Sequence, residues 1–160
     1  MDAIKLLYIH HWRELMSLLK KLYYKDHYPF IVFNLPPQLS NTMDEMTGFL
    51  PRIDVLSPSC KFVLCFVLNQ NELTSIATQV IPQLEEDALF WIAYPKKSSK
   101  QYKTDLSREH GWELLGSYGY EFVTLISLND DFSIIRLRHI SHIKTMVRSD
   151  AMKLTKNYPK

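Results

Sequence analysis

The residues best suited to binding chemistry gather directly after one apolar run. Residues 89–94 are apolar or aromatic and end at Pro95, and three lysines and two serines follow within five residues: Lys96, Lys97, Ser98, Ser99 and Lys100. Ammonium, hydroxyl and backbone N–H groups favour a phosphate or carboxylate. Arg108 lies in the first turn of the helix that we expect next, and a helix N-terminus favours the same anion.

Two more arginines extend this candidate set. Arg136 and Arg138 alternate with Leu137, so both share one face of a predicted strand. They could join the loop lysines or pair with acidic side chains, and the second arrangement is the commoner one. The tentative anion-binding set is therefore Lys96, Lys97, Ser98, Ser99, Lys100, Arg108, Arg136 and Arg138.

Other reactive residues do not assemble into a recognisable catalytic or metal site. His139 and His142 could share a helical face, but two ligands without a third make a weak zinc site. His110, near Asp105, could act as a general base, yet no nucleophile with a recognisable elbow lies nearby. We assign no catalytic residue and no metal.

Four glycines argue against a nucleotide cofactor. Gly48, Gly111, Gly116 and Gly119 do not follow a strand in a G-x-G arrangement, which a dinucleotide or methyl-donor site requires. We therefore expect no cofactor.

Composition predicts a single globular domain over residues 1–160, with 46% hydrophobic and 22% charged residues. Cys60 and Cys65 are five apart, which on a strand places them on opposite faces. Unpaired thiols favour a reduced, cytoplasmic compartment. The first residues do not resemble a signal peptide, and no apolar run reaches the ~20 residues of a membrane span.

Charge divides the chain into two unequal halves. Residues 1–88 hold seven Lys/Arg against ten Asp/Glu, giving −3, and residues 89–160 hold twelve against seven, giving +5. This favours an anionic partner on the second half. One such partner is nucleic acid, with Tyr94, Tyr102 or Trp112 stacking on bases.

The spacing of apolar residues predicts a helix over residues 2–24. Its apolar arc is about 200° wide, which is broader than the apolar stripe of an ordinary amphipathic helix. Either this helix is nested in its own domain, or one flank packs on a second copy to make a homodimer. Both interpretations remain open.

The remaining pattern predicts an α/β chain. We expect strands at 29–35, 60–68, 89–94, 121–128 and 132–138, a short strand or connection at 53–56, and helices from 41 or 42 to 49, at 70–86, and from 104 or 105 to 118. Strand 60–68, helix 70–86 and strand 89–94 make a β-α-β unit. Asn69 and Glu72 form a capping box at the start of its helix, and Pro82 should kink or end that helix. The fold class is a three-layer Rossmann-like sandwich, mostly parallel, with a C-terminal antiparallel hairpin. A basic tail, 141–160, begins as a helix and frays.

Three segments resemble a family of small uncharacterised bacterial α/β proteins, a domain of unknown function. Tyr94–Ser99 matches its YPK-x-x-S, Asp105–Trp112 its D-x-x-R-x-x-G-W, and Asp131–Arg138 its D-W-S-x-x-R-x-R, with Phe132 in place of tryptophan. The resemblance covers residues 29–140. It implies a fold and a shared surface but no reaction.

We therefore expect a cytoplasmic protein without catalytic activity that binds an anionic small molecule, phosphate or a protein partner through the basic 95–108 loop. Two alternatives stay open. One is an enzyme on a degenerate, methyltransferase-like scaffold that lacks the glycine-rich loop. The other is a nucleic-acid-binding module.

Overall fold

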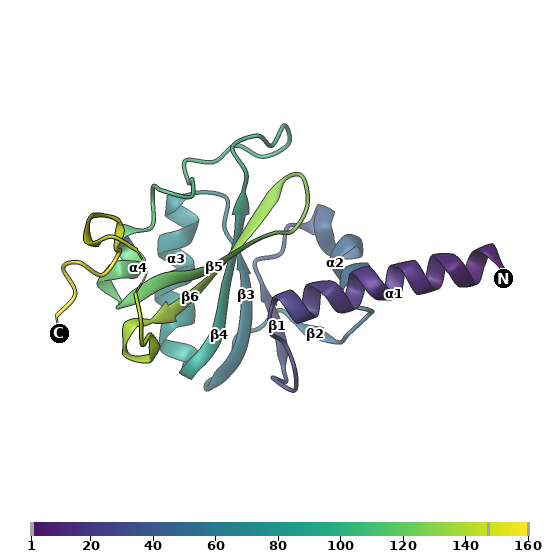
Figure 1. Cartoon of the computed structure of the whole chain (residues 1–160), viewed down its shortest axis with the longest axis horizontal. Coiled ribbons are helices and arrows are strands. Elements are labelled where there is room, and N and C mark those ends of the chain that lie inside the picture. Colours follow the sequence, from purple (N-terminus) through teal and green to yellow (C-terminus); the bar gives the residue numbers. More distant parts are fainter. Residues whose placement is uncertain (1, 147, 160) are drawn as a thin grey trace.

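A computed structural model of the chain describes residues 2–146 and 148–159. The side chains of residues 8, 10–17 and 150 lie outside this description, as does Lys160. The prediction of a broad apolar arc on the first helix therefore falls partly outside the described residues. The described chain folds around one sheet, and its first helix projects from the rest (Figure 1).

Six strands form the sheet in the spatial order β2-β1-β3-β4-β6-β5. Strands β1 to β4 pair in parallel, whereas β6 is antiparallel to both of its neighbours, β4 and β5. This confirms a mixed α/β fold, mostly parallel, with antiparallel pairing towards one edge. The strands are β1 (Phe30–Phe33), β2 (Arg52–Ile53), β3 (Cys60–Phe66), β4 (Leu84–Pro95), β5 (Tyr120–Ser127) and β6 (Phe132–His139).

The predicted β-α-β unit is confirmed as β3, α3 (Gln70–Val80) and β4. The Asn69 side chain accepts a hydrogen bond from the backbone N–H of Glu72 at 2.9 Å, as the capping pattern predicts. The helix ends before the predicted limit of 86. It gives way at Ile81–Gln83 to a 3₁₀ turn that contains Pro82, which confirms the prediction that Pro82 kinks or ends it. Strand β4 then begins at Leu84, which pairs with Cys60 across an irregularity in the register.

The prediction of a helix from 104 or 105 to 118 is wrong. Only α4 (Glu113–Ser117) is helical, and the preceding residues form turns. The side chain of Thr104 accepts a hydrogen bond from the N–H of Leu106 at 3.0 Å, and Gly111 has a φ of +100°. Short hydroxyl side chains that bond nearby N–H groups, together with a left-handed glycine, oppose a continuous helix.

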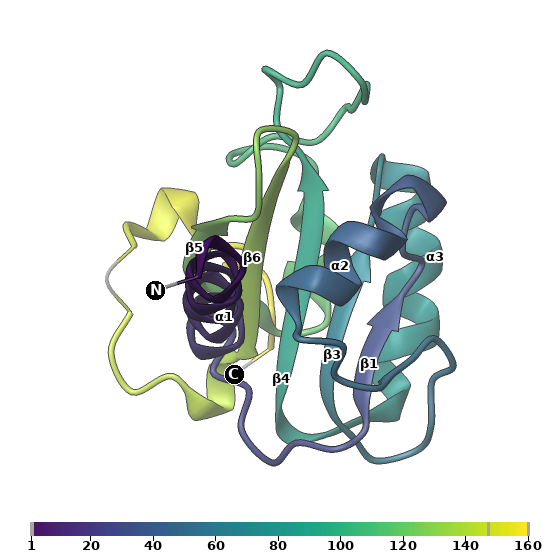
Figure 2. The same ribbon diagram turned by 90° about the vertical axis from the view of Figure 1, so that its right-hand side faces the viewer.

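Apolar residues cover both faces of the sheet. One buried cluster joins α3 to alternate β3 residues such as Val63 and Cys65, and the other joins Phe62 and Leu64 to the opposite helices. Figure 1 shows the sheet with α3 and α4 on one side, and α1 (Ala3–Lys21) and α2 (Ser40–Met46) on the other. Figure 2 looks onto the face that α1 and α2 cover.

Two sequence expectations about smaller features need correction. Cys60 and Cys65 are free and buried, as expected, but both belong to the α3-side cluster, because the register shifts between Cys60 and Phe62. The tail does not fray after a helix. It forms 3₁₀ turns at Ile140–His142 and Asp150–Met152 and then packs back onto the domain, where Thr155 is 8% exposed.

Candidate functional site

The loop after β4 is tied to the turn between β5 and β6. The Lys96 ammonium donates to the hydroxyl of Ser127 and to the carbonyl of Asn129, both at 2.7 Å. The Ser99 hydroxyl donates to the Asp131 carboxylate, also at 2.7 Å. Two of the predicted anion ligands therefore hold the loop in place, and their hydrogen-bonding groups already have partners within the protein.

These contacts also give a structural role to the segments behind the family resemblance. Lys96 and Ser99 come from the YPK-x-x-S segment, and Asp131 begins the segment that ends at Arg138. The bond from Ser99 to Asp131 joins the two segments directly.

Lys97, Ser98 and Lys100 are exposed on the outside of the same loop. They remain accessible to solvent at the carboxyl end of β4, where the sequence analysis placed them. The helix N-terminus expected beside them is missing, because the segment around Arg108 is not helical. The predicted anion site thus loses its helix dipole, and three flexible surface groups remain.

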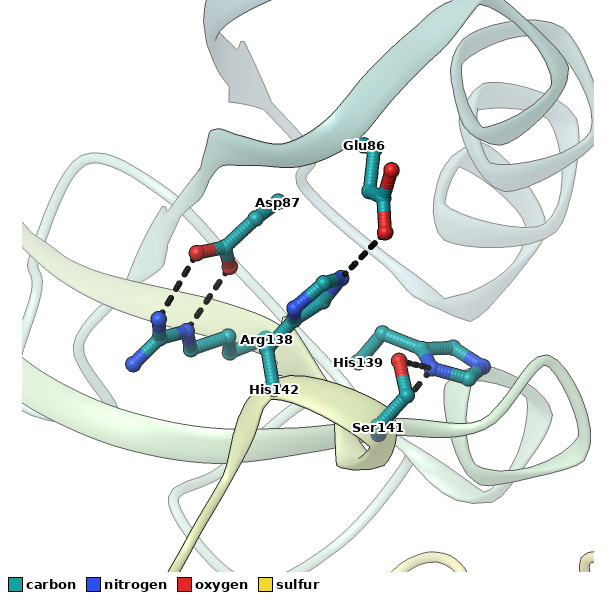
Figure 3. Close-up of polar contacts among 6 residues, drawn as sticks. All are labelled: Glu86, Asp87, Arg138, His139, Ser141 and His142. Atoms are coloured by element: carbon teal, nitrogen blue, oxygen red, sulfur yellow. Dashed lines mark hydrogen bonds and ion pairs between the residues drawn. The ribbon is translucent and has the colours of Figure 1, made fainter.

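Arg136 and Arg138 lie towards the opposite end of the sheet from this loop. In the antiparallel ladder, Phe132 pairs with Pro95 and Arg136 pairs with Trp91, so the arginines run back towards the start of β4. Arg138 donates two hydrogen bonds to the Asp87 carboxylate, at 2.8 and 2.7 Å (Figure 3). The hydrogen bonds from Arg138 hold the pKa of Asp87 below its usual value.

Arg136 has a different environment from Arg138. Its guanidinium carbon lies 5.4 Å from the centre of the Tyr23 ring, just after α1. Burial, reinforced by the charge of Arg138, lowers its pKa, and its Nε has no hydrogen-bond partner among the described residues. Neither arginine joins the loop lysines, so pairing was the correct expectation for Arg138 only.

Arg108 occurs instead at a pair of adjoining cavities near the edge strand β5. The smaller cavity has a volume of about 210 Å³ and the larger about 500 Å³, and both are lined by Arg108, Phe122 and Arg148. The smaller one is lined by Tyr94, Arg108, Trp112, Phe122, Val123, Thr124, Leu125, Ile135 and Arg148. The two arginines are the only charged groups among these lining residues.

Aromatic rings form one wall of the smaller cavity. The Trp112 ring meets the Tyr94 ring at 4.9 Å and the Phe122 ring at 5.4 Å between centres, both edge to face. The indole N–H of Trp112 donates to the carbonyl of Ser107 at 2.6 Å, which holds the turn that carries Arg108. Burial raises the pKa of Tyr94, although the nearby charge of Arg108 opposes this rise.

Arg148 reaches the cavity from the C-terminal tail. Its guanidinium carbon lies 4.9 Å from the centre of the Phe122 ring. Its Nη1 is buried and has no hydrogen-bond partner among the described residues. A buried charged donor without an acceptor is costly, so this atom is where an anion would be stabilised most.

The floor of the same cavity is apolar and open to solvent. Val123 and Leu125 on β5 are 38% and 44% exposed. The larger cavity is different, because Glu109 and Glu113 line it together with cationic side chains. The smaller cavity is therefore the better candidate for an anion-binding site, because Arg108 and Arg148 lie beside its apolar and aromatic surface.

The tail is held beside these cavities by a buried carboxylate. Glu121 is fully buried, and one of its oxygens accepts bonds from the N–H and the hydroxyl of Thr155, both at 2.7 Å. Gly116 on α4 lies so close to the carbonyl of Leu154 that any side chain there would collide with it. These contacts fix the path of the tail that carries Arg148.

The histidines and the predicted base do not converge on the cavities. The His139 ring bonds Ser141, and the His142 ring lies 3.8 Å from the Glu86 carboxylate (Figure 3). Asp105 accepts a bond from the N–H of Gln70, and neither it nor His110 lines the two cavities described above. Within the described residues, no group of three or more potential metal ligands occurs.

Two of the three rings predicted to stack on nucleic-acid bases are covered by protein. Tyr94 and Trp112 are 4% and 1% exposed. Tyr102 packs against Phe132, with 4.9 Å between ring centres. Base stacking through Tyr94 or Trp112 is therefore wrong as a prediction, because both rings are buried among other side chains. Stacking through the half-buried Tyr102 stays a prediction.

Sequence reasoning missed Arg148 and Phe122 as members of the site. The excess of basic residues in the tail was the only indication of Arg148, and it did not show where the tail would pack. The bonds between Glu121 and Thr155 that decide this packing join residues 34 apart in the sequence.

Comparisons with known proteins add no relative. No protein-family model matches the chain, and no curated protein matches it significantly. In the described residues, no helix has the length and apolar character needed to cross a membrane. A proposal for function therefore rests on the geometry of the site.

Proposed function

We propose that the chain is a binding protein without catalytic activity, and that its ligand is a small organic anion with an apolar or aromatic body. The ligand binds in the smaller cavity, with its negative group between Arg108 and Arg148. The observation that carries this proposal is the buried Nη1 of Arg148, which has no partner among the described residues.

The neighbouring surface supports an amphipathic ligand over a simple inorganic ion. The two guanidinium groups lie beside Val123, Leu125 and the aromatic wall. Binding is favoured when the apolar part of a ligand covers this wall and both are removed from water. A volume of about 210 Å³ lies below the 300–1,000 Å³ of drug-sized sites, which suits one ring or a short acyl chain. Arginine binds carboxylate and phosphate alike through paired N–H donors.

This proposal keeps the anionic ligand that the sequence predicts and moves it from the lysines to the Arg108 end of the 95–108 loop. Phosphate, a protein partner and nucleic acid remain predictions for Lys97, Ser98 and Lys100, as does the alternative of an enzyme. A reduced, cytoplasmic compartment is a further proposal, supported by two unpaired thiols.

The finer fold class is also a proposal. A three-layer Rossmann-like sandwich of the methyltransferase type is supported by apolar clusters on both sheet faces and by the antiparallel β6 between β4 and β5. The resemblance to the family of small uncharacterised bacterial proteins likewise remains a proposal, supported by the direct bond between two of its segments.

The test uses benzoate and phenyl phosphate as probes, in thermal-shift and calorimetric titrations. Both should raise the melting temperature, whereas neutral benzamide should not. Arg108→Ala and Arg148→Ala should each weaken binding at least tenfold, since a hydrogen bond to a charged group contributes about 1.5–3 kcal/mol.

The matched control is the double variant Lys97→Ala with Lys100→Ala, which removes the same kind of charge from outside the cavity. It should bind both probes like the unaltered protein. If neither probe stabilises the protein, or if the control loses binding as much as the arginine variants do, the proposal is wrong.

A further inference from the structure

The N-terminal turns of α1 project from the body of the protein (Figure 1). Every described side chain from Ala3 to Ile9 is exposed, and among the side chains of this helix that the structure describes, the first buried one is Leu18. At a rise of about 1.5 Å per residue, roughly 20 Å of helix separates Ile4 from that anchor. We call the projecting residues 3–9 the arm.

Large apolar side chains on the arm are exposed to an unusual degree. Ile4, Leu6, Leu7 and Ile9 are 62%, 51%, 71% and 46% exposed. Successive residues turn by about 100°, so these four point in widely separated directions around the helix. Lys5 is the one charged residue of the arm. A helix with apolar side chains in several directions is normally buried, and a short helix without contacts is marginal in water. The arm therefore requires cover on more than one side.

The other end of the same helix is fixed to the domain. Leu18 and Leu22 are buried in the apolar cluster between the sheet and helices α1 and α2. The carbonyl of Leu22 accepts a hydrogen bond from the Trp91 indole N–H at 3.1 Å. Tyr23, two residues after the end of α1, is 48% exposed, and its ring lies 6.0 Å from that of Trp91. The body thus offers apolar surface where the arm of a second molecule could rest.

We propose that the arm binds a second copy of the chain, with the two α1 helices antiparallel about a two-fold axis. Asp2 is exposed at the start of α1, and Lys20 and Lys21 are exposed at its end. Antiparallel pairing brings Asp2 of one copy close to Lys20 and Lys21 of the other, at both ends of the helix pair. It also places the positive end of each helix dipole beside the negative end of the other, which is favourable.

The register that pairs these charges also covers the arm. When Asp2 lies opposite Lys21 of the second copy, Ile4 lies opposite Leu19, next to the anchored end of that copy's helix. The arm then has a helix on one side and the body of the second copy on another. A membrane surface fits less well, because interfacial helices carry a strongly charged face rich in lysine and arginine, whereas Lys5 is the single charged residue of the arm. This proposal is independent of the anion cavity.

Association is measured by sedimentation equilibrium of the full chain from 1 to 100 µM. The unaltered protein should be a dimer, and the double variant Ile4→Glu with Leu7→Glu should be a monomer that unfolds in the same cooperative way. Val55→Glu is the matched control, since Val55 is an equally exposed apolar residue, at 66%, in the connection after β2. It should remain a dimer.

A charge exchange tests the antiparallel arrangement itself. Asp2→Lys alone, and Lys20→Asp with Lys21→Asp alone, should each weaken the dimer about tenfold, because each change acts at two equivalent contacts. Combining all three should restore it.

Three results would overturn the proposal. They are a monomer at 100 µM, a failure of the combined variant to recover, and binding of the arm to vesicles of phosphatidylcholine and phosphatidylserine in place of dimer formation.

Discussion

Four arginines in the second half of the chain carry the same charged group in four different environments. Arg138 makes two bonds to a carboxylate, and Arg136 is half-buried beside an aromatic ring. Arg148 is partly buried over another ring, and Arg108 is exposed. Only the last two face one cavity, so the residue type alone does not identify the site; the neighbours of each guanidinium do.

The pair formed by Asp87 and Arg138 should stabilise the fold only above acid pH. Arg138 lowers the pKa of Asp87 in the folded protein, so the contribution is complete above the unfolded value of about 3.9 and is lost as the pH falls through the folded value. Asp87→Asn should lower the free energy of unfolding by about 0.5–1 kcal/mol at pH 7. Urea unfolding at pH 7 and near pH 2 measures both limits.

Asparagine suits this substitution because Asp87 has a φ of 53°, which asparagine also tolerates. Glu85→Gln is the control, since Glu85 is an exposed carboxylate two residues earlier. Its effect on stability should be small at both pH values. An equal loss for Asp87→Asn at pH 7 and at pH 2 would show that the charge of Asp87 does not contribute.

At the scale of elements, the tail and α4 form one packed unit that carries Arg148. A methyl group at Gly116 would meet the backbone carbonyl of Leu154, which a flexible side-chain shift cannot relieve. Gly116→Ala should therefore displace the tail, cost about 1–3 kcal/mol of stability and weaken benzoate binding. Limited trypsin digestion should cleave at Lys153 or Lys156 faster than in the unaltered protein.

Ser117→Ala, on the same helix, serves as the control, because the Ser117 hydroxyl donates a hydrogen bond to the carbonyl of Leu114 within α4. Cleavage of the tail should stay slow in this variant. If Gly116→Ala leaves both the digestion and benzoate binding unchanged, the tail does not position Arg148.

The elements that sequence predicts well are those with local causes. The apolar run 60–68 and the capping pair of Asn69 and Glu72 define β3 and α3 without help from distant residues. The residues before Gly111 show the opposite case, because hydroxyl groups and a positive φ override a pattern that looks helical. Arg148 comes close to Arg108 because the tail packs against β5 and α4. These contacts join residues far apart in the sequence, so no local sequence pattern predicts them.

At the scale of the whole molecule, the two thiols report on the integrity of the sheet. Burial raises the pKa of Cys65 well above its ordinary value, and Cys60 shifts in the same direction. Neither should react with a disulfide reagent at pH 8 while the protein is folded, because the reactive form is the thiolate. Two thiols per chain should react in urea, and one in the Cys60→Ala variant.

Reaction rates measured against urea concentration should follow the loss of secondary structure. Fast labelling of either thiol in the native protein would mean that the sheet opens locally at β3. Such opening would contradict the close packing of both cysteines in one cluster.

The position of β6 has a consequence for the order in which a newly made chain can fold. Strand β5 pairs only with β6, which follows it in the sequence. During synthesis, β1 to β4 can assemble while the backbone N–H and C=O groups of β5 have no neighbouring strand, until β6 enters between β5 and β4. The cavity is lined by both Phe122 and Arg148, so it cannot form before the chain has been made as far as the tail.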